Sequence, residues 1–192
     1  VDDPVTQRCE TVGRVHPHLE VKIVDENGQI VPAGTQGELC TRGYSVMKGY
    51  WDDPGRSAEA IRDGWMHTGD LAVFDKDGFC TITGRVKDMI IRGGENIYPR
   101  EIEEFLYAHP QVREAQVFGV PDDKLGEVVC AWVVPTASGD VSAETLRSFC
   151  QGQIAHFKIP THFKIVEELP MTITGKPQKF VMRDVTIEEL AR

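Results

Sequence analysis

The stretch from residue 84 to residue 99 constrains the fold more than any other part of the chain. It contains a basic turn, an apolar run at residues 89–91, the glycine pair Gly93-Gly94 and then Pro99 followed by acidic residues. An apolar run predicts a buried strand, paired glycines favour a turn, and proline is favoured at the first position of a helix. The stretch therefore predicts a strand, a turn and a helix start in immediate succession.

The residues after Pro99 continue this pattern with alternating helical and extended signals. Ile102, Phe105 and Leu106 recur at helical spacing, so they predict one apolar face of an amphipathic helix. The β-branched runs at residues 112–120 and 128–134 predict two strands separated by a turn.

The last third of the chain predicts two more helices and one more strand. Ser142 is expected to cap a helix whose apolar residues again recur at helical spacing. A strand at residues 162–166 and a short final helix at residues 186–191 complete the predicted pattern. From Pro99 onward the predicted order is helix, strand, strand, helix, strand, helix.

Residues 1–84 predict a β-rich region. Asn27-Gly28 and Asp77-Gly78 are tight-turn signals between runs of alternating or β-branched residues, as expected for antiparallel hairpins. Between these hairpins, residues 52–63 predict a short helix that is capped near Asp53 or Ser57.

Composition narrows the class of protein. The chain has 192 residues and a formal net charge of −9, which argues against sequence-independent nucleic-acid binding. Its five cysteines are scattered without a Cys-x-x-Cys pair, so neither a disulfide framework nor a zinc site is predicted, and a reducing compartment fits. No apolar run approaches the roughly 18 residues that span a bilayer, and no cleavable signal is visible.

Four motifs occur in chain order: Gly37-Glu38-Leu39 with Gly43, Gly49 and Tyr50; Trp65-Met66-His67-Thr68-Gly69-Asp70; residues 84–99; and Pro170-Met171-Thr172-Ile173-Thr174-Gly175-Lys176. Together they resemble the motifs of the acyl-adenylate-forming, or AMP-binding, superfamily. Within it the resemblance is to fatty acyl-CoA synthetases of the medium-chain type, and residues 155–160 favour that type over peptide-synthetase domains.

The resemblance implies an α+β fold in two parts. Residues 1–84 would be the β-rich end of a large N-terminal domain, residues 85–88 a hinge, and residues 89–192 a small mobile α+β C-terminal domain of the acyl-CoA synthetase type. The chain begins at Val1 without an initiator Met, and the family's phosphate loop precedes the resembling region. We therefore expect a C-terminal fragment that packs against its own N-terminal domain and is inactive alone.

The implied activity is that of an acid–thiol ligase. The parent enzyme would activate a carboxylic acid with ATP as acyl-AMP and transfer the acyl group to CoA, releasing AMP and pyrophosphate. ATP would bind as Mg-ATP with the metal held upstream of Val1, so no metal site is expected in this chain. Alternatives are an aryl-CoA ligase, a luciferase-like enzyme, or a non-catalytic nucleotide- or CoA-binding module.

The resemblance also assigns roles to residues that bind the nucleotide. Lys176 would be the catalytic cation between carboxylate and phosphate and would also bind the nucleotide. Asp70 would accept hydrogen bonds from the ribose hydroxyls, and Arg85 would be a second nucleotide contact. Taken singly, Lys176 could be a solvated surface charge, Asp70 a turn residue and Arg85 half of a surface ion pair.

Two further roles concern movement and CoA. Lys87 would be the hinge position, whose backbone torsions change when the C-terminal domain rotates. Gly93, Gly94 and Glu95 would line the passage for CoA, since absent side chains make room. The simpler alternatives are a polar linker at Lys87 and plain turn glycines at residues 93–94, which lack the Gly-Lys-Ser/Thr ending of a P-loop.

The sequence also bears on the compartment and the oligomeric state of the protein. The scattered cysteines favour the cytoplasm, with a mitochondrial location in a eukaryote left open, and a homo-oligomer is also left open. His67 and His156 are expected to be packed or hydrogen-bonded structural residues rather than general bases.

Overall fold

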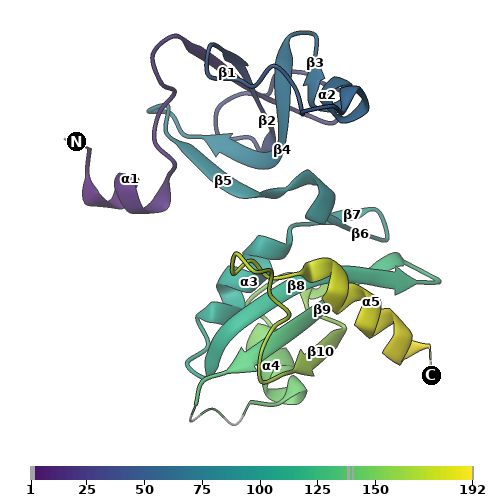
Figure 1. The fold of residues 1–192 in the computed structure, drawn as a ribbon. Coiled ribbons are helices and arrows are strands. Elements are labelled where there is room, and N and C mark those ends of the chain that lie inside the picture. Colours follow the sequence, from purple (N-terminus) through teal and green to yellow (C-terminus); the bar gives the residue numbers. More distant parts are fainter. Residues whose placement is uncertain (1–2, 138, 140, 192) are drawn as a thin grey trace. The chain divides into compact units, whose positions relative to one another are not determined.

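The computed structural model describes residues 3–137, 139 and 141–191. The chain forms two compact units, Val1–Lys87 and Asp88–Arg192. Each has its own sheet, and the helices and strands of both are labelled in Figure 1.

An antiparallel five-stranded sheet dominates the first unit. Its order is β1-β2-β4-β3, with β5 also paired to β4. The predicted turns are confirmed, since Asp25 N donates to Gln29 O and Asp75 N donates to Phe79 O. The strands are β1 (Leu19–Val24), β2 (Gly37–Gly43), β3 (Ile61–Arg62), β4 (Trp65–Phe74) and β5 (Cys80–Arg85).

The first unit also has two short helices, one before β1 and one between β2 and β3. Helix α2 (Pro54–Ala60) begins after Asp53, whose side chain accepts a hydrogen bond from Arg56 N at 2.9 Å, so the predicted cap at Asp53 is confirmed. Helix α1 (Val5–Glu10) was not predicted, and it buries no residue and has no side-chain cap. Because α1 has no buried face, no periodic apolar pattern in the sequence marks it.

Strand β4 departs from regular pairing near its middle. Its register with β2 jumps from Glu38–Leu71 to Cys40–His67, which leaves residues 68–70 opposite a single residue of β2. Such a β-bulge leaves backbone groups without ladder partners and re-aims the side chains it carries.

A mixed sheet forms the centre of the second unit. Strands β8 (Val112–Asp122) and β9 (Gly126–Pro135) are antiparallel, and β10 (His162–Ile165) runs parallel to β9. The short hairpin of β6 (Ile90–Arg92) and β7 (Glu95–Ile97) joins β9 through the pair Arg92–Gly126.

Helices lie on both faces of this sheet. The helices are α3 (Pro99–Tyr107), α4 (Ala143–Cys150) and α5 (Lys179–Leu190), and a 3-10 turn lies at His156–Lys158. A second 3-10 turn, Val86–Asp88, spans the boundary between the two units in the sequence. The order from Pro99 onward is the predicted one, and Ser142 caps α4 by accepting a hydrogen bond from Thr145 N. The chain is an α+β protein, as predicted.

The apolar run in β9 is continuous because both of its faces are buried. Val129, Ala131 and Val133 belong to one core cluster, which also contains Ile102 and Leu106 of α3 and Leu146 and Cys150 of α4. Val128, Cys130, Trp132 and Val134 belong to a second cluster, with Met182 of α5. Figure 1 shows α5 crossing the sheet as the last element of the chain. A strand covered on both faces needs no polar alternation.

The final helix is longer than predicted. The prediction of a short helix at residues 186–191 is wrong at its start, because α5 begins at Lys179. Met182 is fully buried in the second core, and Val185 and Ile187 pack against it. This burial stabilises the first half of the helix, whereas the polar pair Arg183-Asp184 interrupts the local apolar pattern.

Candidate functional site

The predicted nucleotide residues Asp70 and Arg85 form an ion pair. They face each other in the register of β4 and β5, and Arg85 Nε donates to Asp70 Oδ1 at 2.8 Å. The Asp70 side chain is 34% exposed and that of Arg85 is 63% exposed, so the pair stays accessible to a ligand. A carboxylate has capacity for several hydrogen bonds and can accept from hydroxyl groups while it holds the guanidinium.

The turn before Asp70 is held by local hydrogen bonds. Thr68 Oγ1 donates to Leu39 O at 2.8 Å and accepts from Asp70 N at 3.1 Å. Gly69 has a φ of +73°, a backbone conformation that side-chain-bearing residues rarely adopt. Asp70 thus follows a turn whose shape depends on the Thr68 hydroxyl and on the positive φ of Gly69.

Three side chains with metal-ligand atoms meet behind this turn. One ligand atom each from Glu38, Cys40 and His67 lie within 4.8 Å of one another. However, Glu38 Oε2 and His67 Nδ1 are 2.7 Å apart, which is hydrogen-bond distance, and Arg62 Nη2 lies 3.6 Å from the same oxygen. Burial raises the pKa of the Cys40 thiol, and the Glu38 charge raises it further. The arrangement is a hydrogen-bonded cluster, which the residue spacing did not reveal.

Lys87 lies in the 3-10 turn Val86–Asp88, at the end of the first compact unit. Its side chain is exposed. The turn separates β5 from β6, so only a few backbone torsions link the two sheets along the chain.

The glycine pair forms the turn of the β6–β7 hairpin, and Glu95 opens β7. Gly93 and Gly94 have φ angles of +58° and +88°. Gly93 N donates to Leu125 O at 2.8 Å, and a Cβ atom at Gly93 would lie 3.3 Å from Leu125 Cδ2. The turn is thus built from residues without side chains and is seated on the β8–β9 loop.

A basic cavity of about 170 Å³ begins at Arg92, beside this hairpin turn. Arg92 Nε is buried and has no hydrogen-bond partner among the residues that the structure describes. Arg147 Nη2 donates to Thr161 O at 2.9 Å on the cavity wall. The lining residues are Arg92, Arg147, Gln151, His156, Ile159, Pro160 and Thr161. The cavity offers cationic and neutral donors suited to an anionic group.

Lys176 lies in the loop between β10 and α5, and backbone hydrogen bonds define that loop. Thr172 N donates to Lys176 O at 2.8 Å, Lys176 N donates to Thr172 Oγ1 at 3.0 Å, and Gly175 N donates to Thr172 O at 2.9 Å. The loop closes where Gln178 N donates to Pro170 O at 2.8 Å. The Lys176 side chain is exposed.

The segment that follows Lys176 is anchored to the rest of its unit. Lys179 Nζ lies 2.7 Å from Glu103 Oε1, which also accepts a hydrogen bond from Val117 N. Farther along α5, Trp132 Nε1 donates to Thr186 Oγ1 at 2.9 Å inside the core. These contacts fix the position of α5, the helix into which the Lys176 loop leads.

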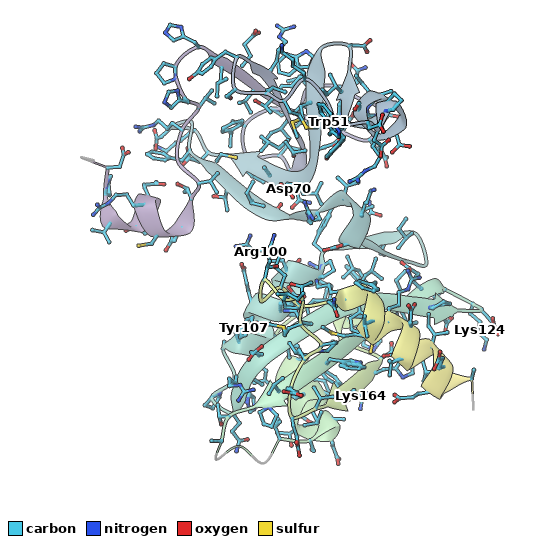
Figure 2. All side chains as sticks on the ribbon, viewed as in Figure 1. Trp51, Asp70, Arg100, Tyr107, Lys124 and Lys164 are labelled. Atoms are coloured by element: carbon cyan, nitrogen blue, oxygen red, sulfur yellow. The ribbon has the colours of Figure 1, made fainter. Side chains whose placement is uncertain are left out.

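The structure thus brings some of the predicted residues together. Asp70 and Arg85 pair within the first unit, and Gly93, Gly94 and Glu95 form one turn in the second, which also carries Lys176. Sequence reasoning left out Glu38 as a contact of the Asp70 turn, and it missed the Arg92–Arg147 cavity. Neither had a local signal, because both join residues far apart in the chain. The labelled side chains of Figure 2 include Asp70, the exposed Lys124 and the half-buried Lys164.

Comparison with known families identifies the chain. Residues 101–176 match the family described as AMP-binding enzyme C-terminal domain, and residues 1–51 match AMP-binding enzyme. Together the two matches cover more than half of the sequence. The chain belongs to the AMP-binding enzyme family.

The relatives are acyl-CoA synthetases and ligases. The chain is 56% identical over 189 residues to the putative acyl-CoA synthetase YngI of Bacillus subtilis (strain 168), covering 97% of the chain and 34% of YngI. It is 52% identical over 185 residues to the mitochondrial medium-chain acyl-CoA ligase ACSF2 of Bos taurus, covering 95% and 30%. The ATP-bound structure of MatB from Rhodopseudomonas palustris superposes with a TM-score of 0.88 at 37% identity, covering 93% of the chain and 36% of MatB.

The chain spans about a third of the length of the curated relatives it matches. Within the part of the chain that the structure describes, none of the helices combines the length and apolarity that a membrane crossing needs.

Proposed function

We propose that this chain is the C-terminal part of an ATP-dependent acyl-CoA ligase that acts on fatty acids. The enzyme would join a carboxylate to the α-phosphate of ATP, forming acyl-AMP and releasing pyrophosphate. The thiol of CoA would then attack the acyl carbonyl and displace AMP. The observation that carries the proposal is the accessible Asp70–Arg85 pair on a bulged strand, in a chain that resembles acyl-CoA ligases along nearly its whole length.

Asp70 and Arg85 have the chemistry to hold the nucleoside part of ATP. The Asp70 carboxylate can accept hydrogen bonds from both ribose hydroxyls, and the Arg85 guanidinium orients that carboxylate and can reach ribose or phosphate oxygen. Because these contacts would be the same in the bound substrate and in the transition state, their main effect would be on the KM for ATP.

Lys176 would serve the adenylation step. Two anions approach each other in that step, so an ammonium group between carboxylate and phosphate interacts more strongly with the transition state than with the separate reactants. Its exposed position on a hydrogen-bonded loop supports this role, because the ammonium can enter a ligand site.

The glycine hairpin and the cavity beside it would serve the thioester step. The turn at Gly93 and Gly94 leaves room for a narrow flexible chain such as the pantetheine arm of CoA, and Glu95 begins the strand beside it. Arg92 Nε is buried and has no partner within the described part of the chain, and Arg147 lines the same cavity; both support binding of an anionic group of CoA there. The exposed Lys87 in its 3-10 turn would be the position about which the second unit rotates between the two steps.

The identity to ACSF2 supports a medium-chain fatty acid as substrate, and the free cysteines support a reducing compartment such as the cytoplasm or the mitochondrial matrix.

The test is acyl-CoA and AMP production by the full-length enzyme with ATP, CoA and a panel of short- to long-chain acids, measured by mass spectrometry. Acyl-CoA with equimolar AMP, best for medium-chain acids, is the expected result. Acyl-AMP without thioester would instead assign another adenylate-forming activity, and no turnover on any acid would overturn the proposal in favour of a binding module. The 192-residue chain alone should release no pyrophosphate from ATP.

A further inference from the structure

Glu38 is the one acidic side chain of the Glu38–Cys40–His67 cluster, and it contacts the β4 bulge at two points. Its Oε1 accepts from Gly69 N at 3.2 Å, and its Oε2 lies 2.7 Å from His67 Nδ1. The side chain is 19% exposed, so both interactions are shielded from bulk water. These two contacts lie on either side of Thr68, in the segment that leads into Asp70.

The bulge explains why such a contact matters. Residues 68–70 face a single residue of β2, so the β2–β4 ladder does not fix their backbone on that side, whereas Asp70 pairs with Arg85 of β5 on the other. Glu38 comes from the neighbouring strand and supplies an acceptor to the Gly69 amide, while Thr68 Oγ1 accepts from the Asp70 amide. A hydrogen bond that is shielded from bulk water is stronger than the same bond in contact with water.

The distances within the Glu38–Cys40–His67 cluster do not suit a metal ion bound to Glu38 and His67. A cation bound to both Glu38 Oε2 and His67 Nδ1 would need more than their present 2.7 Å separation, since each metal bond is about 2.0–2.2 Å long. The guanidinium of Arg62, 3.6 Å from the same oxygen, already supplies positive charge. The contacts therefore favour a role in fixing the turn.

We propose that Glu38 is a positioning residue for nucleotide binding, which acts through Gly69 and His67 to hold Asp70 in the orientation that accepts the ribose hydroxyls. This inference rests on the proposed nucleotide role of Asp70. It assigns Glu38 no contact with substrate, and it makes the β4 bulge part of the ATP site.

The test compares three substitutions in the full-length enzyme. Glu38→Ala removes both contacts, and Glu38→Asp keeps the charge but shortens its reach. Glu38→Gln retains both contacts, because its carbonyl accepts from Gly69 N and its amide donates to His67 Nδ1 in the other imidazole tautomer. We expect Glu38→Ala and Glu38→Asp to raise the KM for ATP about tenfold with kcat within about twofold, and Glu38→Gln to stay within about threefold of the parent.

A merely structural role gives a different pattern. Loss of folded enzyme would lower the apparent kcat and leave the KM for ATP unchanged, and that result would overturn the inference. If Glu38→Ala does not fold, Glu38→Asp carries the same comparison. In the 192-residue chain, the Gly69 amide resonance should shift in Glu38→Ala and remain near its original position in Glu38→Gln; an unmoved Gly69 amide in both would also count against the inference.

Asp70→Ala separates this inference from the function on which it rests. If Asp70→Ala leaves the KM for ATP unchanged, the nucleotide role of Asp70 fails. If Asp70→Ala raises that KM but Glu38→Ala does not, only the positioning role fails. In the double variant, Glu38→Ala should add nothing to the effect of Asp70→Ala, because the two residues act on one contact.

Discussion

Arg85 and Asp70 occupy paired positions on β5 and β4, and the Nε atom of Arg85 lies 2.8 Å from Oδ1 of Asp70. The ion pair is too exposed to contribute much to folding, since exposed pairs contribute about 0–1 kcal/mol. Substitutions of Asp70 or Arg85 should therefore change ligand binding with little effect on the stability of the fold.

Asp70→Asn should raise the KM for ATP in the full-length enzyme about tenfold or more. The amide keeps the size of the side chain but loses the charge and one acceptor, so a ribose hydroxyl loses a charge-assisted hydrogen bond. Steady-state kinetics with varied ATP measure the effect. Asp63→Asn is the matched control, because Asp63 is an exposed turn residue with a φ of +51°, which Asn also tolerates. An equal rise in both variants would remove the nucleotide role from Asp70.

Lys176→Ala should slow acyl-adenylate formation by about two orders of magnitude or more, the scale for loss of one preorganised transition-state contact. Preformed acyl-adenylate should still react with CoA at a rate close to that of the parent enzyme. Pyrophosphate release and thioester formation, measured separately, test this division. Lys124→Ala is the control, an exposed lysine of the same unit on the β8–β9 turn. Equal loss of both half-reactions in Lys176→Ala would contradict the proposed role.

Thr186→Val should lower the free energy of unfolding of the chain by about 1–3 kcal/mol. Thr186 Oγ1 accepts from Trp132 Nε1 at 2.9 Å, both residues are buried, and valine leaves the indole N–H without that partner. Urea denaturation followed by tryptophan fluorescence measures the change. Thr161→Val, at an exposed position, should shift the midpoint little. Indistinguishable midpoints for the two variants would show that Trp132 finds another acceptor.

The buried thiols should make the fold less stable at alkaline pH. Burial raises the pKa of Cys130 to about 12 and that of Cys150 to about 11. In the unfolded chain these thiols ionise near pH 8.5, so above that pH the unfolded state loses protons that the folded state retains. The stabilisation is complete below about pH 8.5 and declines as the pH rises toward the folded values, by at most about 1.4 kcal/mol per pH unit for each thiol.

Urea midpoints between pH 7 and pH 10 test this dependence. Cys130→Ala should be less stable at pH 7 because it leaves a small cavity, but its stability should fall less steeply with pH. Under native conditions a thiol reagent should react quickly with Cys9 alone, which is the exposed cysteine, and with all five after denaturation. Rapid native labelling of Cys130 would contradict its burial.

The elements that sequence predicted well are those with a local cause. Asn27-Gly28 and Asp77-Gly78 mark turns, Ser142 caps α4, and the β-branched run of residues 128–134 lies in β9. Each depends on the conformational preference of nearby residues. The start of α5 at Lys179 depends instead on burial of Met182 in a core made by distant strands, so the local pattern could not reveal it.

The same distinction applies to the candidate site. Motifs named Asp70, Arg85 and Lys176, and their functional roles remain predictions. The contact of Glu38 with Gly69 joins residues 31 positions apart, and the cavity at Arg92 and Arg147 joins a hairpin to a helix. Such contacts arise from strand register and helix packing, which no short window of sequence contains.

The loop that carries Lys176 is restrained at both of its ends. Its two ends are joined where Gln178 N donates to Pro170 O, and Lys179 just beyond is tied to Glu103. The lysine backbone therefore cannot leave its unit by loop opening alone while those ties persist. If the ammonium serves only one half-reaction, it would leave the site by movement of the whole second unit. The rate of that rigid-body movement would then set when each half-reaction can occur.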